Sequence, residues 1–254
     1  MYLPVHWQKH EVNVRMDQDG TTDVPGDDEF TAIRKSMDTW NQVDCPHPQF
    51  VDAGFVSGIE PCIGTKCVGT NVILWEDEAT WTKLHPIDDT SPDPVTLRTI
   101  ALTTLYYNDS TGAADSFDLE LNNFRFHYSV TDDPDLAQTD IQNTITHELG
   151  HVLAMDHSHD PEATMYYTAT TGAMWMRTLG EDDITGLCAM YLFFPSDGDA
   201  VADSSEETGE GSSGGDDGCS AGRTAPSPAL AIVLLLPLAL FPALRRVRTR
   251  RTSA

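Results

Sequence analysis

Apolar side chains recur with two different periods along the first 195 residues, and each period predicts a different kind of element. Residues 3–16 alternate apolar and polar side chains, which predicts a strand that ends in the turn Asp-Gln-Asp-Gly. Residues 27–43 carry large apolar side chains at helical spacing, after two aspartates that suit a helix N-cap. The buried face of this amphipathic helix would consist of Phe30, Ile33, Met37 and Trp40.

Four further segments are typical of strands, because Gly, Pro, Asp and Ser clusters bound them. They are residues 50–56, 71–78, 96–107 and 117–126. Helical spacing returns in residues 139–155 and again in residues 180–193. We expect the last helix to bury Ile184, Leu187, Cys188 and Tyr191.

The character of the chain changes after Pro195. Residues 196–218 hold eight acidic residues and no basic ones, which predicts an extended, disordered linker. The apolar run 229–244 predicts a helix that just crosses a membrane if it is counted from Thr224. A buried core helix is the alternative, but nothing follows for it to pack against. The arginines of residues 245–251 favour a cytoplasmic C-terminus, with the body of the protein outside.

This tail resembles the C-terminal sorting signal of myxobacterial surface proteins, through a Gly-Cys-Ser junction at Cys219, a short apolar helix and terminal arginines. The resemblance implies processing near Cys219 and an exported protein that is anchored at the cell surface or outer membrane. It divides the chain into a body (1–195), a linker (196–218) and an anchor segment (219–254). Because the N-terminus lacks the pattern of a secretory signal, we expect the true start of the protein to lie upstream.

Charge narrows the range of partners. The chain has 40 acidic and 15 basic residues, for a formal net charge of −25. Binding to nucleic acid needs clustered Lys and Arg, so we expect no nucleic-acid partner for the main body. The acidity is consistent with solubility, and we expect a monomer.

Four of the five cysteines lie in the body of the chain, and an exported body predicts disulfides between them. We expect Cys62 to pair with Cys67, because a short loop is the easiest to close, and Cys45 to pair with Cys188. A zinc site with cysteine ligands is the alternative, although the chain contains no Cys-x-x-Cys motif.

The stretch His-Glu-Leu-Gly-His predicts a metal site. In a helix, His147 and His151 lie one turn apart on the same face, so that both imidazoles can bind one ion. Glu148 lies where its carboxylate can reach a metal-bound water without ligating the metal. Imidazole ligands suit zinc, and a catalytic zinc site requires a third protein ligand. Two surface histidines on an ordinary helix are the alternative.

His157 lies six residues after His151, the spacing at which the metzincin metalloproteases place their third histidine ligand. In that family the helix stops at a glycine and the chain turns back to the metal. Ala154 occupies that place here, and a left-handed conformation costs such a residue about 1 kcal/mol. Zinc binding, on the order of ten kcal/mol, outweighs that cost. If the helix instead ran straight through Ala154, His159 would be the candidate third ligand.

The wider sequence is similar to the matrixins within this class. The similar segments are HELGHVLAMDHS, PEATMYY and LGEDDITGLCAMY, and Met165 lies at the place of the family's Met-turn. The resemblance spans residues 1–195, with specific motifs only in residues 140–191. It implies an α+β fold with a twisted, mostly parallel sheet, an antiparallel edge strand, an active-site helix and a C-terminal helix.

The resemblance also implies a zinc-dependent endopeptidase with Glu148 as general base, acting on proteins or peptides, with an edge strand at 99–107 or 117–122 that binds substrate. The alternative is a surface-displayed, metal-binding adhesion module without protease activity. Such a module would be expected to lose its glutamate first, so Glu148 favours the enzyme. We also expect contact with a membrane through the C-terminal segment.

Three features are less specific. Tyr167 forms a Met-x-Tyr pattern with Met165, and in astacin-like and serralysin-like relatives that tyrosine ligates zinc or stabilises the transition state. Matrixins place no such tyrosine, so a packed aromatic is the favoured role for Tyr167. In the segment 117–122, Asp118, Glu120 and Asn122 would share one face of a strand, as calcium ligands or as a solvent-facing strand edge. The inhibitory propeptide and the structural-zinc segment of animal matrixins are not recognisable.

Overall fold

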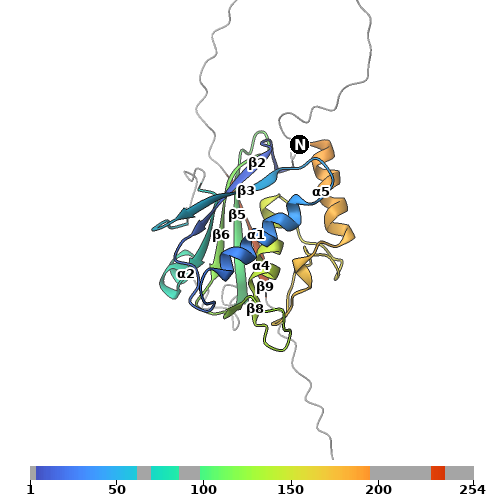
Figure 1. The fold of residues 1–254 in the computed structure, drawn as a ribbon. Helices are drawn as coiled ribbons and strands as arrows, with labels where there is room; N and C mark the ends of the chain where they lie inside the picture. Colours follow the sequence, from blue (N-terminus) through green and yellow to red (C-terminus); the bar gives the residue numbers. More distant parts are fainter. Residues whose placement is uncertain (1–3, 62–69, 86–97, 195–229, 238–254) are drawn as a thin grey trace, which may run out of the picture.

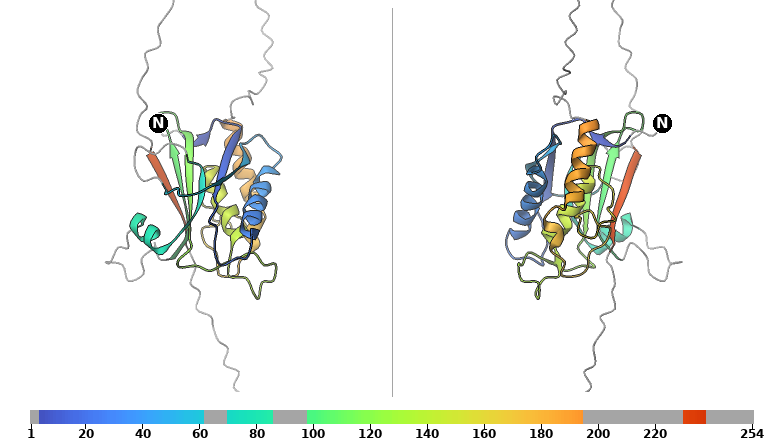
Figure 2. Two further views of the ribbon diagram at one scale, coloured as in Figure 1. Left: turned by 60° about the vertical axis from the view of Figure 1, so that its left-hand side comes forward. Right: turned by 90° about the vertical axis from the view of Figure 1, so that its right-hand side faces the viewer.

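The computed structural model describes residues 4–61, 70–85 and 98–194, together with the backbone of residues 230–237. In chain order its elements are β1 (His6–Trp7), β2 (Glu11–Asp17), α1 (Asp28–Asn41), β3 (Gln49–Val56), β4 (Val72–Glu76), α2 (Glu78–Leu84), β5 (Thr99–Tyr107), β6 (Ala113–Asn122), β7 (Tyr128–Ser129), β8 (Thr139–Asp140), α4 (Ile141–Val152), η1 (Trp175–Arg177), α5 (Glu181–Phe193) and β9 (Leu230–Pro237). The long helices α1, α4 and α5 lie on one side of a sheet, and α2 lies apart from them (Figures 1 and 2).

The main sheet has the strand order β3-β2-β4-β6-β5-β9, with β1 paired to β6. The pairs β2·β3, β2·β4, β4·β6 and β1·β6 are parallel, whereas β5 pairs antiparallel with β6. The prediction of an α+β fold with a mostly parallel sheet and an antiparallel strand toward one edge is confirmed. Of the two predicted substrate-binding segments, 117–122 lies inside the sheet and only β5 lies toward its edge.

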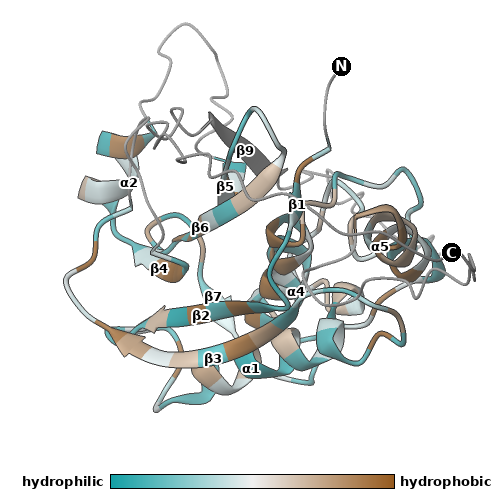
Figure 3. Ribbon diagram, turned by 90° about the horizontal axis from the view of Figure 1, so that it is seen from above, coloured by the Kyte–Doolittle hydropathy of each residue, from teal (hydrophilic) through white to brown (hydrophobic). Residues whose placement is uncertain are grey.

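The core forms where the sheet meets α1 and α4. Val12, Val14 and Met16 of β2 are buried, as the alternation predicts. Helix α1 mixes hydrophobic and hydrophilic residues (Figure 3), and its predicted apolar face is buried. Buried Trp40 donates its indole N–H to the carbonyl of Thr146 on α4, at 2.8 Å. An aromatic side chain contributes on the order of 2–3 kcal/mol by burial, so this contact fixes α1 against the helix that carries the histidine motif.

Two details of the helices differ from the sequence prediction. Helix α2 was not expected; Asp77 caps it, with its side chain accepting from the backbone N–H of Thr80 at 2.8 Å. In α5 the side chain of Ile184 is 41% exposed, although Leu187 and Tyr191 are buried. The buried stripe of α5 follows Asp183, Leu187 and Tyr191 at four-residue spacing, and Ile184 lies just outside it.

The expected apolar helix at 229–244 is also corrected within its described part. Residues 230–237 form strand β9, which pairs antiparallel with β5 from Tyr107 opposite Leu230 to Thr99 opposite Pro237. Without β9 the outer edge of β5 would carry unpaired backbone groups, and the β-branched residues Ile232 and Val233 favour a strand. In the described residues no helix has the length and apolarity needed to span a bilayer.

A disulfide joins Cys45 to Cys188, with a Cα–Cα distance of 5.7 Å, and it is the pairing predicted from the sequence. It links the segment after α1 to α5 across 143 residues of sequence. Closing so long a loop restricts the unfolded chain and contributes about 5 kcal/mol in the chain-entropy view. Cys62 and Cys67, the other predicted pair, lie outside the described residues.

The polar face of β6 is buried, which corrects the idea of a solvent-facing strand edge. Asp118 and Asn122 are fully buried and Glu120 is nearly so. Asp118 accepts from the hydroxyl of Thr70, while Glu120 faces the imidazole of His85 at 2.8 Å. Within the described chain these carboxylates are not part of a cluster of three ligand groups. Calcium binding therefore stays a prediction.

Next to this face, burial raises the pKa of Glu76 to about 8, and the charge of Glu120 adds to the effect. The pKa of Glu76 is therefore higher in the folded protein than in the unfolded chain, and the neutral carboxyl group favours the folded state. This contribution to stability is complete below the unfolded pKa and is lost as the pH rises through about 8. Glu76→Gln should remove this loss. Relative to the original chain, the free energy of unfolding of the variant should be higher at pH 9 than at pH 5 by on the order of 3 kcal/mol. Urea unfolding at the two pH values measures it. Glu78→Gln removes the same charge from an exposed position, and an equal effect there would contradict the prediction.

Candidate metal centre

Helix α4 carries two of the predicted ligands and places both side chains inside the protein. Its N-cap Asp140 accepts from the backbone N–H of Asn143 at 2.7 Å, which satisfies one of the free amides of the first turn. His147, Glu148 and His151 are fully buried on this helix. The spacing of four residues brings the two imidazole rings to a centroid distance of 4.8 Å.

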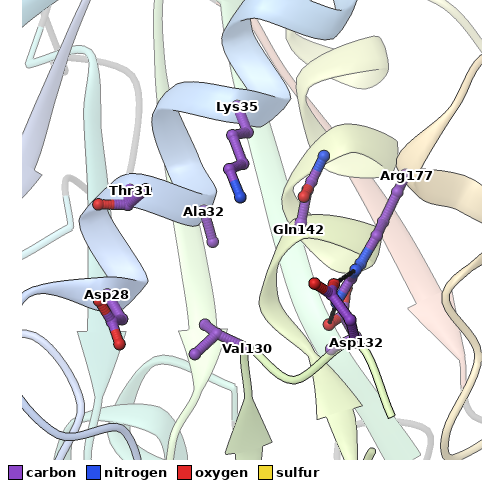
Figure 4. Close-up of a pocket in the computed structure, with 9 residues that line it drawn as sticks. Asp28, Thr31, Ala32, Lys35, Val130, Asp132, Gln142 and Arg177 are labelled. Carbon is purple, nitrogen blue, oxygen red and sulfur yellow. Dashed lines mark hydrogen bonds and ion pairs between the residues drawn. The ribbon is translucent and has the colours of Figure 1, made fainter. Parts of the chain in front are cut away.

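The N-cap of α4 is itself held from outside the helix. Arg177 of η1 donates from Nε to Asp140 at 2.8 Å and pairs with Asp132 at 2.7 Å, as Figure 4 shows for Asp132. These groups border a pocket of about 220 Å³ between α1 and the start of α4, into which Lys35 also points (Figure 4). None of the lining residues belongs to the histidine cluster, so the pocket marks a structural junction rather than the chemical centre.

Helix α4 ends at the residue where the sequence predicts the exit turn. Ala154 has a φ of 67°, in the left-handed region. The amide of Ala154 donates to the carbonyl of His151 at 2.9 Å, and that of Met155 donates to the carbonyl of Gly150 at 3.0 Å. These two hydrogen bonds form a Schellman motif, in which a glycine is the usual left-handed residue. The chain therefore turns at Ala154 and does not continue as a helix.

Ala154→Gly should stabilise the protein by up to about 1 kcal/mol, because glycine adopts a positive φ without steric cost. Zinc affinity should not decrease. Thermal unfolding of the zinc-saturated protein measures the effect. The matched control is Ala163→Gly at a buried position outside this turn, which should destabilise. A melting temperature lowered by Ala154→Gly would contradict the strain at this residue.

The turn returns His157 to the two histidines of α4. Nε2 of His157 lies 3.2 Å from Nε2 of His151, and candidate ligand atoms of all three histidines lie within 4.8 Å of one another. His159 is exposed and lies near the ring of Tyr167 instead. Of the two candidates for a third ligand, the structure brings only His157 into the cluster.

Backbone carbonyls orient the two helical imidazoles. Nδ1 of His147 donates to the carbonyl of Thr164 at 2.7 Å, and Nδ1 of His151 donates to the carbonyl of Met155 at 2.8 Å. With Nδ1 protonated, Nε2 of each ring keeps its lone pair. Burial lowers the pKa of His147 well below its usual value and that of His151 to about 3, which keeps both rings neutral.

This donor set fits a zinc ion. Nε2 of His147 is buried and has no hydrogen-bond partner in the described structure. Nε2 of His151 and Nε2 of His157 lie 3.2 Å apart, close enough for both to bind one cation. Three neutral imidazoles, of which His147 and His151 are oriented through Nδ1, are the ligands and the outer hydrogen bonds expected of a catalytic zinc site.

Glu148 lies beside this cluster with only one of its carboxylate oxygens engaged. Oε2 accepts from the hydroxyl of Thr103 on β5 at 2.7 Å, whereas Oε1 is buried without a partner in the described structure. Burial raises the pKa of Glu148 to about 8, and the hydrogen bond from Thr103 opposes that rise. A dication bound nearby would also lower the pKa of Glu148, in the same direction as the hydrogen bond from Thr103. A carboxyl group with these properties can accept and return a proton near neutral pH.

Met165 packs against Gly150 of α4, the helix that carries His147 and His151. A Cβ on Gly150 would collide with the sulfur of Met165 and would lie 2.9 Å from the ring of Trp40. The close approach therefore requires glycine at this position of the motif. Met165 itself is 1% exposed, as expected for a Met-turn residue.

Asp183 of α5 holds the Met-turn in place, a role that the sequence analysis did not assign. Its buried carboxylate accepts from the backbone N–H groups of Thr164 at 2.6 Å, Met165 at 2.9 Å and Gly180 at 2.7 Å. Thr164 is the residue whose carbonyl orients His147. The available signal was an aspartate on the buried stripe of an amphipathic helix, where a charge requires partners.

Tyr167 does not take the position of a packed core aromatic. Its side chain is 41% exposed, and its hydroxyl accepts from the hydroxyl of Tyr166 at 3.3 Å. The structure thus places it on the surface, in contact with Tyr166 and His159. Its role as a ligand or a stabilising group stays a prediction.

Helix α4 carries two histidines, the turn at its end brings a third histidine to them, and a buried methionine follows in the chain. This is the arrangement of the metzincin metalloproteases. Comparison with known proteins supports the same class. Residues 68–192 match the family model described as Matrixin. A stretch of 46 residues is 50% identical to human Matrilysin and covers 18% of this chain and 17% of that protein. The matched region is therefore similar to a matrixin-like metzincin, and the chain shares a stretch that is 17% of the length of Matrilysin.

Proposed function

We propose that this protein is a zinc-dependent endopeptidase that hydrolyses peptide bonds of proteins at or outside the cell surface. The observation that carries the proposal is the convergence of His147, His151 and His157 beside a carboxylate with one free oxygen. The three histidines would hold the zinc ion through Nε2. When bound, zinc would polarise the scissile carbonyl and lower the pKa of a water molecule toward 7.

Glu148 carries the proton transfer. Its Oε1 would accept a proton from the attacking water and later deliver it to the leaving nitrogen of the cleaved bond. A pKa raised by burial suits both steps, because the group must take up the proton and release it within one reaction. The burial of His147, Glu148 and His151 also limits the access of bulk water to the reacting groups.

Strand β5 would orient the substrate. An extended peptide can add to the edge of a sheet through backbone hydrogen bonds. The antiparallel pairing of β9 with β5 supports this role, since that edge accepts an extended apolar segment of the chain. A substrate would take the place of β9 on this edge and would lie along the strand that contacts Glu148 through Thr103.

The location of the protein is part of the proposal. The Cys45–Cys188 disulfide supports an exported protein, because disulfides persist in oxidising compartments. Anchoring through the segment after Cys219 rests on the resemblance of the tail alone. A metal-binding adhesion module without activity is the second candidate, and it is disfavoured by an intact Glu148 with a free, buried oxygen.

The proposal is tested with the purified chain and a broad substrate such as casein. We expect about one zinc ion per chain, cleavage of internal peptide bonds, loss of cleavage after chelation and recovery when zinc is restored. Mass spectrometry of the fragments distinguishes an endopeptidase from an exopeptidase. Stoichiometric zinc without cleavage of casein or gelatin would instead support the adhesion module.

A further inference from the structure

The hydroxyl of Thr103 lies where the pattern of β5 calls for an apolar side chain. Ala101, Thr103 and Leu105 pair with Leu121, Leu119 and Phe117 of β6, and all six are buried. A buried hydroxyl without an acceptor would cost about 1–3 kcal/mol, so threonine is acceptable here only with a partner. The nearer acceptor is Oε2 of Glu148, at 2.7 Å, and the backbone carbonyl of the same residue lies farther away, at 3.3 Å.

This hydrogen bond distinguishes the two oxygens of the carboxylate. A glutamate side chain has three rotatable bonds, and holding it in one conformation costs on the order of 1–2 kcal/mol of conformational entropy. Thr103 is stiff at χ1 because it is β-branched, and its strand is paired with β6 along its length. The hydroxyl therefore fixes Oε2 to a rigid support and leaves Oε1 as the free oxygen.

We propose that Thr103 is a positioning residue for the reaction, which holds Glu148 through Oε2 so that Oε1 exchanges the proton. The inference rests on the proposed endopeptidase function. It also connects substrate and base, because the strand that would pair with the peptide is the strand that orients Glu148. Positioning of this kind matters for rate, since displacement of a reacting group by about 1 Å can cost a factor of a hundred.

Kinetics of three variants of the full chain, loaded with zinc, test the proposal. Thr103→Val keeps the shape of the side chain and removes the hydroxyl, whereas Thr103→Ser keeps the hydroxyl. We expect Thr103→Val to lower kcat at least about tenfold with KM within about twofold, and Thr103→Ser to return kcat to within about threefold of the original. The matched control is Thr21→Val, which removes another buried threonine hydroxyl, one that donates to Asn123 at 2.8 Å. It should leave kcat unchanged.

Thermal unfolding gives a readout that does not depend on activity. Thr103→Val should lower the melting temperature of the zinc-saturated protein by about 2–4 °C, the scale of one buried hydrogen bond. In a Glu148→Ala background the same substitution should lower it by less than half as much. The shift caused by Thr21→Val should be equal in both backgrounds.

The outcomes separate the two proposals. If the original chain cleaves casein and depends on Glu148, but Thr103→Val keeps its kcat, the positioning role is wrong and the endopeptidase stands. If Thr103→Ser is as slow as Thr103→Val, the hydroxyl is not the cause and the role is again wrong. If the original chain does not cleave, or cleaves equally with Glu148→Ala, the proposed function itself fails.

Discussion

Glu148→Gln should lower peptidase activity at least about a hundredfold while the protein keeps close to one zinc ion per chain, because only the proton acceptor is lost. His151→Ala should behave differently and lose the metal itself, since it removes one of three imidazoles that converge within 4.8 Å. Metal analysis by mass spectrometry and casein cleavage on the same samples separate the two effects.

The matched control for His151→Ala is His159→Ala, which removes an exposed imidazole from the loop that follows α4. It should keep both zinc and activity. Equal loss of zinc in Glu148→Gln and His151→Ala would show that Glu148 is a ligand rather than the proton acceptor. Loss of zinc in His159→Ala but not in His157→Ala would contradict the turn at Ala154 as the route to the third ligand.

The parts of the site that the sequence could predict are those with a fixed local spacing. His147 and His151 share a helical face by their separation alone, and the return of His157 follows once the chain leaves the helix at Ala154. The positive φ of that alanine was expected in spite of its side chain, because the energy of metal binding exceeds the local strain.

Contacts between distant segments could not be predicted in the same way. Thr103 and Asp183 are 45 and 35 residues from Glu148 in sequence, and each acts through a fold that the local pattern does not specify. Both nevertheless carry a signal in the sequence, since each is a polar residue at a position that faces the core. The burial of Asp118 and Glu120 was missed for a related reason. Alternation assigns residues to two faces of a strand, but it does not say whether the second face is covered.

Asp183→Ala should destabilise the protein by at least about 3 kcal/mol and weaken zinc binding. The substitution leaves three N–H groups without an acceptor, the buried ones of Thr164 and Met165 and the part-buried one of Gly180. Each such group costs about 1–3 kcal/mol, and relaxation of the turn would recover part of the sum. Because the carbonyl of Thr164 orients His147, a displaced turn also misplaces the imidazole that it holds.

Asp182→Ala is the matched control for this prediction. Asp182 is the exposed neighbour on the same helix, and its carboxylate accepts only a hydroxyl, that of Ser158, at 2.6 Å among the hydrogen bonds of the described residues. We expect a cost of about 1 kcal/mol or less for Asp182→Ala, with zinc affinity unchanged. Urea unfolding of the zinc-saturated variants and competition with a chromogenic chelator measure the two quantities. Similar losses at Asp182 and Asp183 would mean that the Met-turn is held by the packing of Met165 against Gly150, and not by the three hydrogen bonds.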